Sequence, residues 1–135
     1  MNCVAVIDVV GLTPELIQKG APFLRDFAKQ GAMCPLVPVT PAVTCSVQST
    51  ILTGLPPSQH GCVANGWYFR ELCEIAFWKQ SNKLVSGEKI WETARRMDPK
   101  FTCANLFWWY NMYSSVDFSV TPRPMYPADG RKIPD

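Results

Sequence analysis

Residues 3–10 form a short and almost unbroken apolar run that is rich in Val and Ile. Such a run is typical of a strand that is buried on both faces of a parallel sheet. One carboxylate, Asp8, lies near the end of the run, and Gly11 follows it. Because ligands of open α/β sheets bind beyond the carboxyl ends of the strands, Asp8 is a candidate ligand of a cation. A carboxylate that caps the following turn explains the position equally well.

Helical and extended patterns alternate along the rest of the chain. We expect a helix start at residues 13–15 with Thr13 as the N-cap, and a helical pattern at 22–30 that Gly31 ends. Further helices are expected at 44–53 and 88–97, with Gly54 as a C-terminal glycine and Ser86 as an N-cap. We expect extended segments at 33–39 and 101–108, and a hairpin from 67–69 and 75–78. The Pro-rich tail from residue 121 to 135 is predicted to be an irregular loop. This alternation predicts an α/β layered sheet with helices on both faces.

Composition narrows the class of protein. The chain has 135 residues, of which 47% are apolar or aromatic and 18% are charged, so one packed globular domain is expected. The net charge is +2 and the basic residues are scattered, which argues against a nucleic-acid polymer as a partner. No signal peptide or apolar run of about 20 residues is evident, so we expect a cytoplasmic protein without a membrane segment. The six cysteines form no C-x-x-C pair and are interpreted as reduced structural thiols.

Two polar residues are further candidates for chemistry. Thr44 begins the expected helix at 44–53, where a hydroxyl is most often a cap. The helix dipole and the free N–H groups at the same place also favour an anion, and a hydroxyl that contacts a divalent cation can attack phosphorus there. Asn65 precedes Gly66 and is either a turn residue or a donor to a phosphoryl oxygen.

These residues lie within a longer motif. Residues 41–55 read Pro-Ala-Val-Thr-Cys-Ser-Val-Gln-Ser-Thr-Ile-Leu-Thr-Gly-Leu, residues 57–61 read Pro-Ser-Gln-His-Gly, and Ala64-Asn65 follow. Together with the apolar run that carries Asp8, this pattern resembles the nucleophile segment of the type I phosphodiesterase/nucleotide pyrophosphatase family of the alkaline phosphatase superfamily. Phosphonoacetate hydrolases share the pattern. The resemblance covers residues 1 to about 70 well, and beyond them it is only a general α/β likeness.

The resemblance implies a metal-dependent hydrolase of phosphodiester or pyrophosphate bonds in nucleotide-type or similar small phosphorylated substrates. It implies that Thr44 is the nucleophile and forms a covalent phospho-enzyme, and that Asn65 holds a phosphoryl oxygen. It also implies two divalent metal ions, usually Zn²⁺, with Asp8 and Thr44 among the ligands. The fold implied is alkaline phosphatase-like, with residues 1–135 as the N-terminal part of a single catalytic domain.

The chain departs from this family in its histidines. The family completes its metal site with further Asp and His ligands, whereas this sequence contains one histidine, His60, in a turn before Asn65. We interpret His60 as structural. The sequence is therefore expected to be a fragment that is inactive or nearly so alone. Phosphonoacetate-type hydrolysis of a C–P bond and a non-catalytic binding module with half the fold are the alternatives.

The aromatic segment 107–113 also has two readings. A nucleotide-binding enzyme can stack a base on such rings, but packing in a core or at an interface is the more common use of large aromatic residues.

Overall fold

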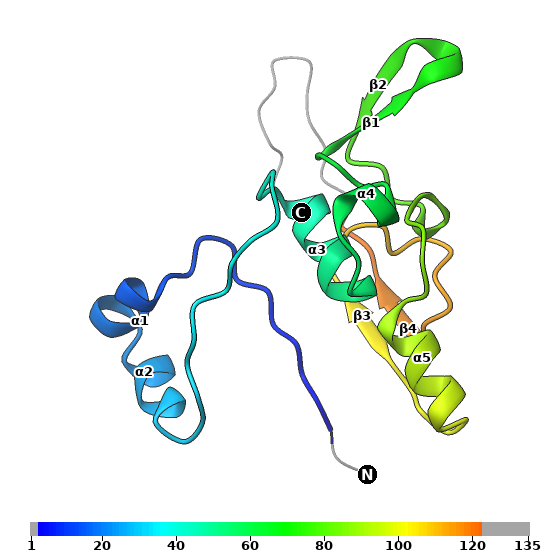
Figure 1. Cartoon of the computed structure of the whole chain (residues 1–135). Helices are drawn as coiled ribbons and strands as arrows, with labels where there is room; N and C mark the ends of the chain where they lie inside the picture. The colour runs from blue at the N-terminus through cyan, green and yellow to red at the C-terminus, as the bar shows by residue number, and fades with distance from the viewer. Residues whose placement is uncertain (1–2, 123–135) are drawn as a thin grey trace. The chain divides into compact units, whose positions relative to one another are not determined.

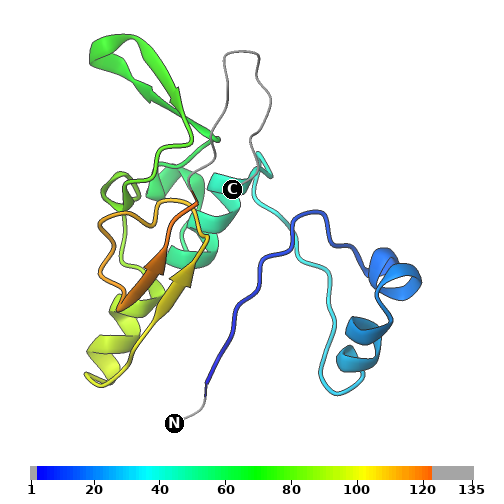
Figure 2. The ribbon, with the colours of Figure 1, turned by 180° about the vertical axis from the view of Figure 1, so that it is seen from behind.

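The computed structural model describes residues 3–122, and the chain divides into two compact units, Met1–Val37 and Pro38–Asp135 (Figures 1 and 2). Each unit is described below by itself. The described residues contain helices and two two-stranded sheets, so the α/β class is confirmed as a small α/β arrangement. The part of the expected Pro-rich loop that lies beyond residue 122 is outside the described residues.

The first unit contains two short helices, α1 (Pro14–Gly20) and α2 (Pro22–Ala28). The expected start of α1 is confirmed, because Thr13 is the N-cap and its Oγ1 accepts a hydrogen bond from the backbone N–H of Leu16 at 3.2 Å. Both helices have a proline in their first turn, where no N–H donor is needed. The predicted start of α1 is therefore correct, and the pattern predicted at 22–30 is observed as α2, which ends two residues earlier.

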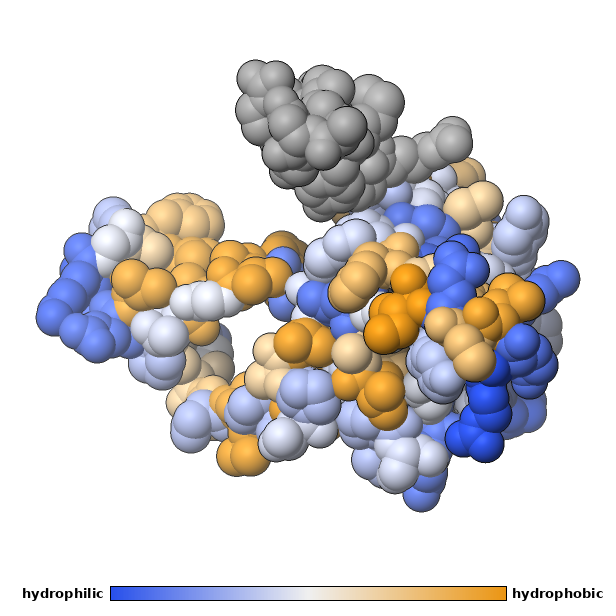
Figure 3. Space-filling model, turned by 90° about the horizontal axis from the view of Figure 1, so that it is seen from above, coloured by the Kyte–Doolittle hydropathy of each residue, from blue (hydrophilic) through white to orange (hydrophobic). Residues whose placement is uncertain are grey.

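The strand expected at residues 3–10 is not formed. These residues carry no helix or strand, and their apolar side chains are exposed, with Val4 at 86% and Ile7 at 81% of full exposure. The physical reason is that a parallel strand needs a neighbouring strand for its hydrogen bonds, and the described residues of this unit offer only α1 and α2. The extended segment expected at 33–39 likewise forms no strand. Figure 3 shows apolar side chains on the surface of each unit.

The second unit begins its regular structure with α3 (Thr44–Thr53), which has the predicted bounds. Gly54 ends the helix in a left-handed conformation with φ of 69°, and its N–H donates to the carbonyl of Thr50 at 2.8 Å. The turn-rich stretch that follows contains a single helical turn, α4 (Pro57–His60). The sequence pattern predicted α3 correctly because a helical interior pattern ends in Gly54.

The predicted hairpin is confirmed. Strand β1 (Gly66–Phe69) pairs antiparallel with β2 (Glu74–Phe77), and Gly66 lies opposite Phe77. The 3₁₀ turn η1 (Arg70–Leu72) connects the two strands. In Figures 1 and 2 this hairpin extends away from α3 and α5. Asn65 therefore lies at the base of the hairpin, next to the body of the unit.

The helix expected at 88–97 is observed as α5 (Ile90–Met97), which follows the 3₁₀ turn η2 (Asn82–Leu84). Its N-cap position is Lys89 and not Ser86, so that prediction is wrong by three residues. The Glu92 carboxylate accepts the backbone N–H of Lys89 at 2.9 Å, which is the bond from the third helical residue back to the N-cap in a capping box.

The second sheet contains one predicted and one unpredicted strand. Strand β3 (Ala104–Leu106) lies within the expected extended segment 101–108, and it pairs in parallel with β4 (Phe118–Val120). Strand β4 was missed because its three residues are too few to show a periodic pattern.

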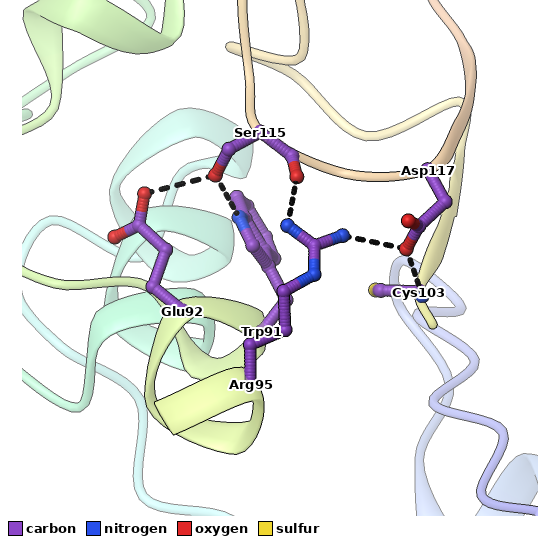
Figure 4. Close-up of polar contacts among 6 residues, drawn as sticks. All are labelled: Trp91, Glu92, Arg95, Cys103, Ser115 and Asp117. Atoms are coloured by element: carbon purple, nitrogen blue, oxygen red, sulfur yellow. Dashed lines mark hydrogen bonds and ion pairs between the residues drawn. The ribbon is translucent and has the colours of Figure 1, made fainter. Parts of the chain in front are cut away.

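A polar network fastens α5 to the chain segment that precedes β4 (Figure 4). The indole N–H of Trp91, a fully buried side chain, donates to the Ser115 hydroxyl at 3.0 Å. Arg95 donates to the carbonyl of Ser115 and to the carboxylate of Asp117. That carboxylate also accepts the backbone N–H of Cys103 at 2.7 Å. The backbone of Cys103 and the Arg95 guanidinium together lower the pKa of Asp117.

The core of the second unit includes α3, which contributes Cys45 to it. It contains Cys45, Cys62, Val85 and Tyr110 as buried apolar members, with Trp67, Trp78, Leu84 and Trp109 packed against it. Tyr110 and Trp109 belong to the aromatic segment 107–113, so the core interpretation is confirmed for these two rings. All six cysteines are free thiols, but only Cys45 and Cys62 are buried.

Candidate functional site

The amino end of α3 presents Thr44. The N-cap position is Val43, an extended residue whose side chain makes no capping hydrogen bond, and Thr44 is the first residue of the helix. The capping interpretation of Thr44 is therefore wrong. Its half-buried side chain stands at the start of the helix without a capping role.

The electrostatics of this helix end favour an anion. The first N–H groups of a helix have no carbonyl partner within it, and the helix dipole adds partial positive charge there. The first turn of α3 carries no acidic side chain that would neutralise this charge. A phosphoryl group is therefore a suitable ligand for the position that Thr44 occupies.

Asn65 is attached directly to this helix end. Its side-chain Oδ1 accepts the backbone N–H of Cys45, the residue after Thr44, at 3.0 Å. Its own carbonyl accepts the backbone N–H of Trp78 at 3.0 Å, which closes the base of the β1–β2 hairpin. Because Oδ1 faces an N–H donor, the other end of the amide is the NH₂ group, which is a hydrogen-bond donor. The structure thus brings together two of the three residues singled out from the sequence.

His60 connects α3 to the segment that precedes Asn65. Its side chain is fully buried, Nδ1 accepts the backbone N–H of Cys62 at 3.0 Å, and Nε2 lies 2.9 Å from the Thr50 hydroxyl of α3. Since Nδ1 is an acceptor, the neutral ring carries its proton on Nε2 and donates it to Thr50. Burial lowers the pKa of His60, so the ring stays neutral. His60 therefore has the structural place that the sequence predicted.

Two buried thiols lie close to Thr44 and Asn65 in the chain. Cys45 and Cys62 have no exposed surface and belong to one core cluster. The neighbouring Cys45 thiol lowers the pKa of Cys62, whereas the Cys62 thiol and burial together raise the pKa of Cys45. Burial likewise raises the pKa of Tyr110, whose hydroxyl lies beside the thiols without a hydrogen bond of normal geometry. The shifts of the two thiols are opposite because the S–H of Cys45 stabilises a thiolate on Cys62, and that negative charge makes the second thiol harder to ionise.

Sequence reasoning missed Gln48. This buried residue of α3 accepts the backbone N–H of Trp109 through Oε1 at 3.0 Å and so joins the helix to the aromatic segment. It follows Thr44 by four residues and therefore lies on the same face of α3. That spacing was the only signal in the sequence that pointed to it.

Asp8 belongs to the first unit, whereas Thr44 and Asn65 belong to the second. Its side chain is exposed within that unit, and its role as a metal ligand stays a prediction. Among residues 3–122, no group of three or more His, Cys, Asp or Glu side chains is placed to hold a metal ion. The described residues therefore do not fit a complete metal centre by themselves.

Comparison with known proteins places the chain in a class of hydrolases. The sequence profile of the type I phosphodiesterase/nucleotide pyrophosphatase family matches residues 4–133. The chain belongs to this family, which is part of the alkaline phosphatase superfamily and consists of phosphoesterase-type hydrolases. A comparison with curated proteins finds no match. Within the described part of the chain, no helix is both long and apolar enough to cross a membrane.

Proposed function

We propose that this chain supplies the nucleophile and a phosphate contact for hydrolysis of phosphodiester or pyrophosphate bonds in nucleotide-type or similar small substrates. The observation that supports this most is the hydrogen bond between Asn65 and the backbone of the residue that follows Thr44. It joins a hydroxyl, a helix N-terminus and an amide donor in one place, where a phosphoryl group has a nucleophile and donors around it.

In this proposal the Thr44 Oγ1 attacks phosphorus, the leaving alcohol or phosphate departs on the opposite side, and a phosphothreonine forms. Water then hydrolyses this ester and regenerates the hydroxyl. The Asn65 amide donates a hydrogen bond to a phosphoryl oxygen as charge develops on it. The dipole of α3 stabilises the same charge.

Asp8 and Thr44 are proposed as the share of metal ligands that this chain contributes toward two divalent ions, with Zn²⁺ as the expected metal. Such ions, when bound, neutralise phosphoryl charge and lower the pKa of an attacking hydroxyl. The carboxylate and hydroxyl oxygens suit such ions, but they do not complete a zinc site, which needs further N, O or S ligands. Residues 1–135 are proposed to be the N-terminal part of one alkaline phosphatase-like catalytic domain with a layered sheet.

The test is hydrolysis of bis-p-nitrophenyl phosphate by the polypeptide that the complete reading frame encodes, with Zn²⁺ added. Thr44→Ala is expected to lower kcat/KM by about a thousandfold or more, because the covalent route is lost. Thr44→Ser keeps a hydroxyl at the same place and is the matched control, with most of the activity retained. Activity of Thr44→Ala within a few-fold of the unmodified protein would remove Thr44 from its proposed role.

A further inference from the structure

The buried thiols Cys45 and Cys62 are placed on the two segments that form the candidate site. Cys45 follows Thr44 in the first turn of α3, and Cys62 lies three residues before Asn65. Both side chains are fully buried in one core cluster, and both remain free thiols. The two segments that carry them are held together by the hydrogen bond between Asn65 and the backbone N–H of Cys45, so a disulfide needs only a small backbone movement.

We propose that Cys45 and Cys62 are a reversible oxidation site, which a peroxide converts to an intramolecular disulfide. The Cys62 sulfur attacks one peroxide oxygen, the O–O bond breaks, and water leaves as a sulfenic acid forms on Cys62. The Cys45 sulfur then attacks the sulfenic sulfur, the S–S bond forms, and a second water leaves. The two thiols lose two electrons and two protons in total, and the peroxide is reduced to two waters. A dithiol reductant reverses the change by exchange.

The position of the pair separates it from the other cysteines. Cys3, Cys34 and Cys73 are exposed, and Cys103 is half-buried. Because Cys45 and Cys62 are shielded, oxidation proceeds through local opening of residues 61–65, which contain no helix or strand. A sulfenic acid formed on Cys62 then meets the Cys45 thiol as the segment closes again, before a second oxidation can occur.

The consequence for activity rests on the proposed function. An S–S bond of about 2.05 Å is much shorter than the packing distance between two unbonded sulfurs, so it draws the first turn of α3 and the segment 61–65 together. The contact between Asn65 and the Cys45 backbone lies between the same two segments. The disulfide therefore changes the position of Thr44 relative to Asn65, and small displacements of this kind strongly lower catalytic rates.

The test is a peptide map after treatment of the folded 135-residue chain with hydrogen peroxide, followed by alkylation of the remaining thiols. Chymotryptic cleavage after Leu36 and Leu52 places Cys34, Cys45 and Cys62 on separate peptides. The expected result is a linked Cys45–Cys62 peptide pair, two hydrogens lighter than the separate peptides, which dithiothreitol releases. The assay does not use hydrolysis, so its failure is distinct from failure of the proposed function.

Three variants define the outcome. Cys45→Ser and Cys62→Ser should each abolish the linked pair, whereas Cys73→Ser removes an exposed thiol and should leave it unchanged. Alkylated Cys45 and Cys62 after peroxide treatment, with oxidation confined to the exposed cysteines, would overturn the proposal. Linkage of either thiol mainly to another cysteine would overturn it as well.

Discussion

Replacement of Asn65 tests whether its side chain holds the nucleophile helix in place. In Asn65→Ala the buried backbone N–H of Cys45 loses the acceptor that lies 3.0 Å away. A buried donor left without a partner costs about 1–3 kcal/mol. With a urea m-value of about 1.5 kcal/mol/M for a protein of this size, a loss of about 2 kcal/mol lowers the unfolding midpoint by roughly 1.3 M.

Tryptophan fluorescence during urea unfolding is the appropriate assay. All five tryptophans follow residue 38, so the signal reports the second unit alone. An unfolding free energy of Asn65→Ala within about 0.3 kcal/mol of the unmodified chain would refute the reasoning, because the measured loss would then be below that of any buried unpaired donor.

Asn65→Asp separates the structural role from the functional one. The carboxylate still accepts the N–H of Cys45, and a negative charge at a helix N-terminus adds about 0.3–1 kcal/mol of stability. The NH₂ donor is lost, and the new charge repels a phosphoryl group. We therefore expect stability at or above that of the unmodified chain together with weaker hydrolysis in the complete polypeptide. Equal stability losses in Asn65→Ala and Asn65→Asp would contradict the hydrogen bond as the cause.

Three further predictions concern stability. Because burial lowers the pKa of His60, the unfolded chain binds a proton below about pH 6.5 while the folded chain does not. The contribution of His60 to stability is therefore complete above that pH and falls as the pH drops toward the folded-state pKa, and urea titrations from pH 8 to pH 5 should show this in the unmodified chain but not in His60→Gln. Trp91→Phe and Ser115→Ala each remove the 3.0 Å hydrogen bond between these side chains, so the double variant should lose about 1 kcal/mol less than the sum of the single losses in the same titration. Gly54→Ala should lower the unfolding free energy by about 1 kcal/mol because φ is 69°, whereas Gly54→Asn should lose less since Asn tolerates this conformation; equal losses would contradict the conformational cause.

Local signals explain which elements could be predicted from the sequence. Helix α3 was predicted correctly because its interior pattern ends in a glycine that adopts a positive φ. The hairpin was predicted because two short aromatic and apolar runs, 67–69 and 75–78, follow the turn signal Asn65-Gly66. The N-cap of α5 was misplaced because Ser86 is a good cap by residue type. The helix in fact begins after Lys89, whose backbone N–H donates to the Glu92 carboxylate.

Contacts between distant residues explain what could not be predicted. The run at 3–10 has the composition of a buried strand, but strand formation depends on a neighbouring strand, which the described residues of its unit do not provide. Strand β4 likewise exists through its pairing with β3 and not through its own three residues. Packing also decided the role of the aromatic segment 107–113, because it buries the Tyr110 side chain in the core.

The sequence by itself determined the family, the helix that presents Thr44, and the choice of Thr44 and Asn65 as chemical candidates. These properties depend on residue type and short spacing, which are present in the chain before it folds. Only the tertiary structure decided that Thr44 is not a cap and that the Asn65 side chain accepts the backbone N–H of Cys45. It also decided that the thiols of Cys45 and Cys62 share one buried cluster. The Asn65 bond and the thiol cluster each join residues far apart in the chain, and only folding brings such residues into contact.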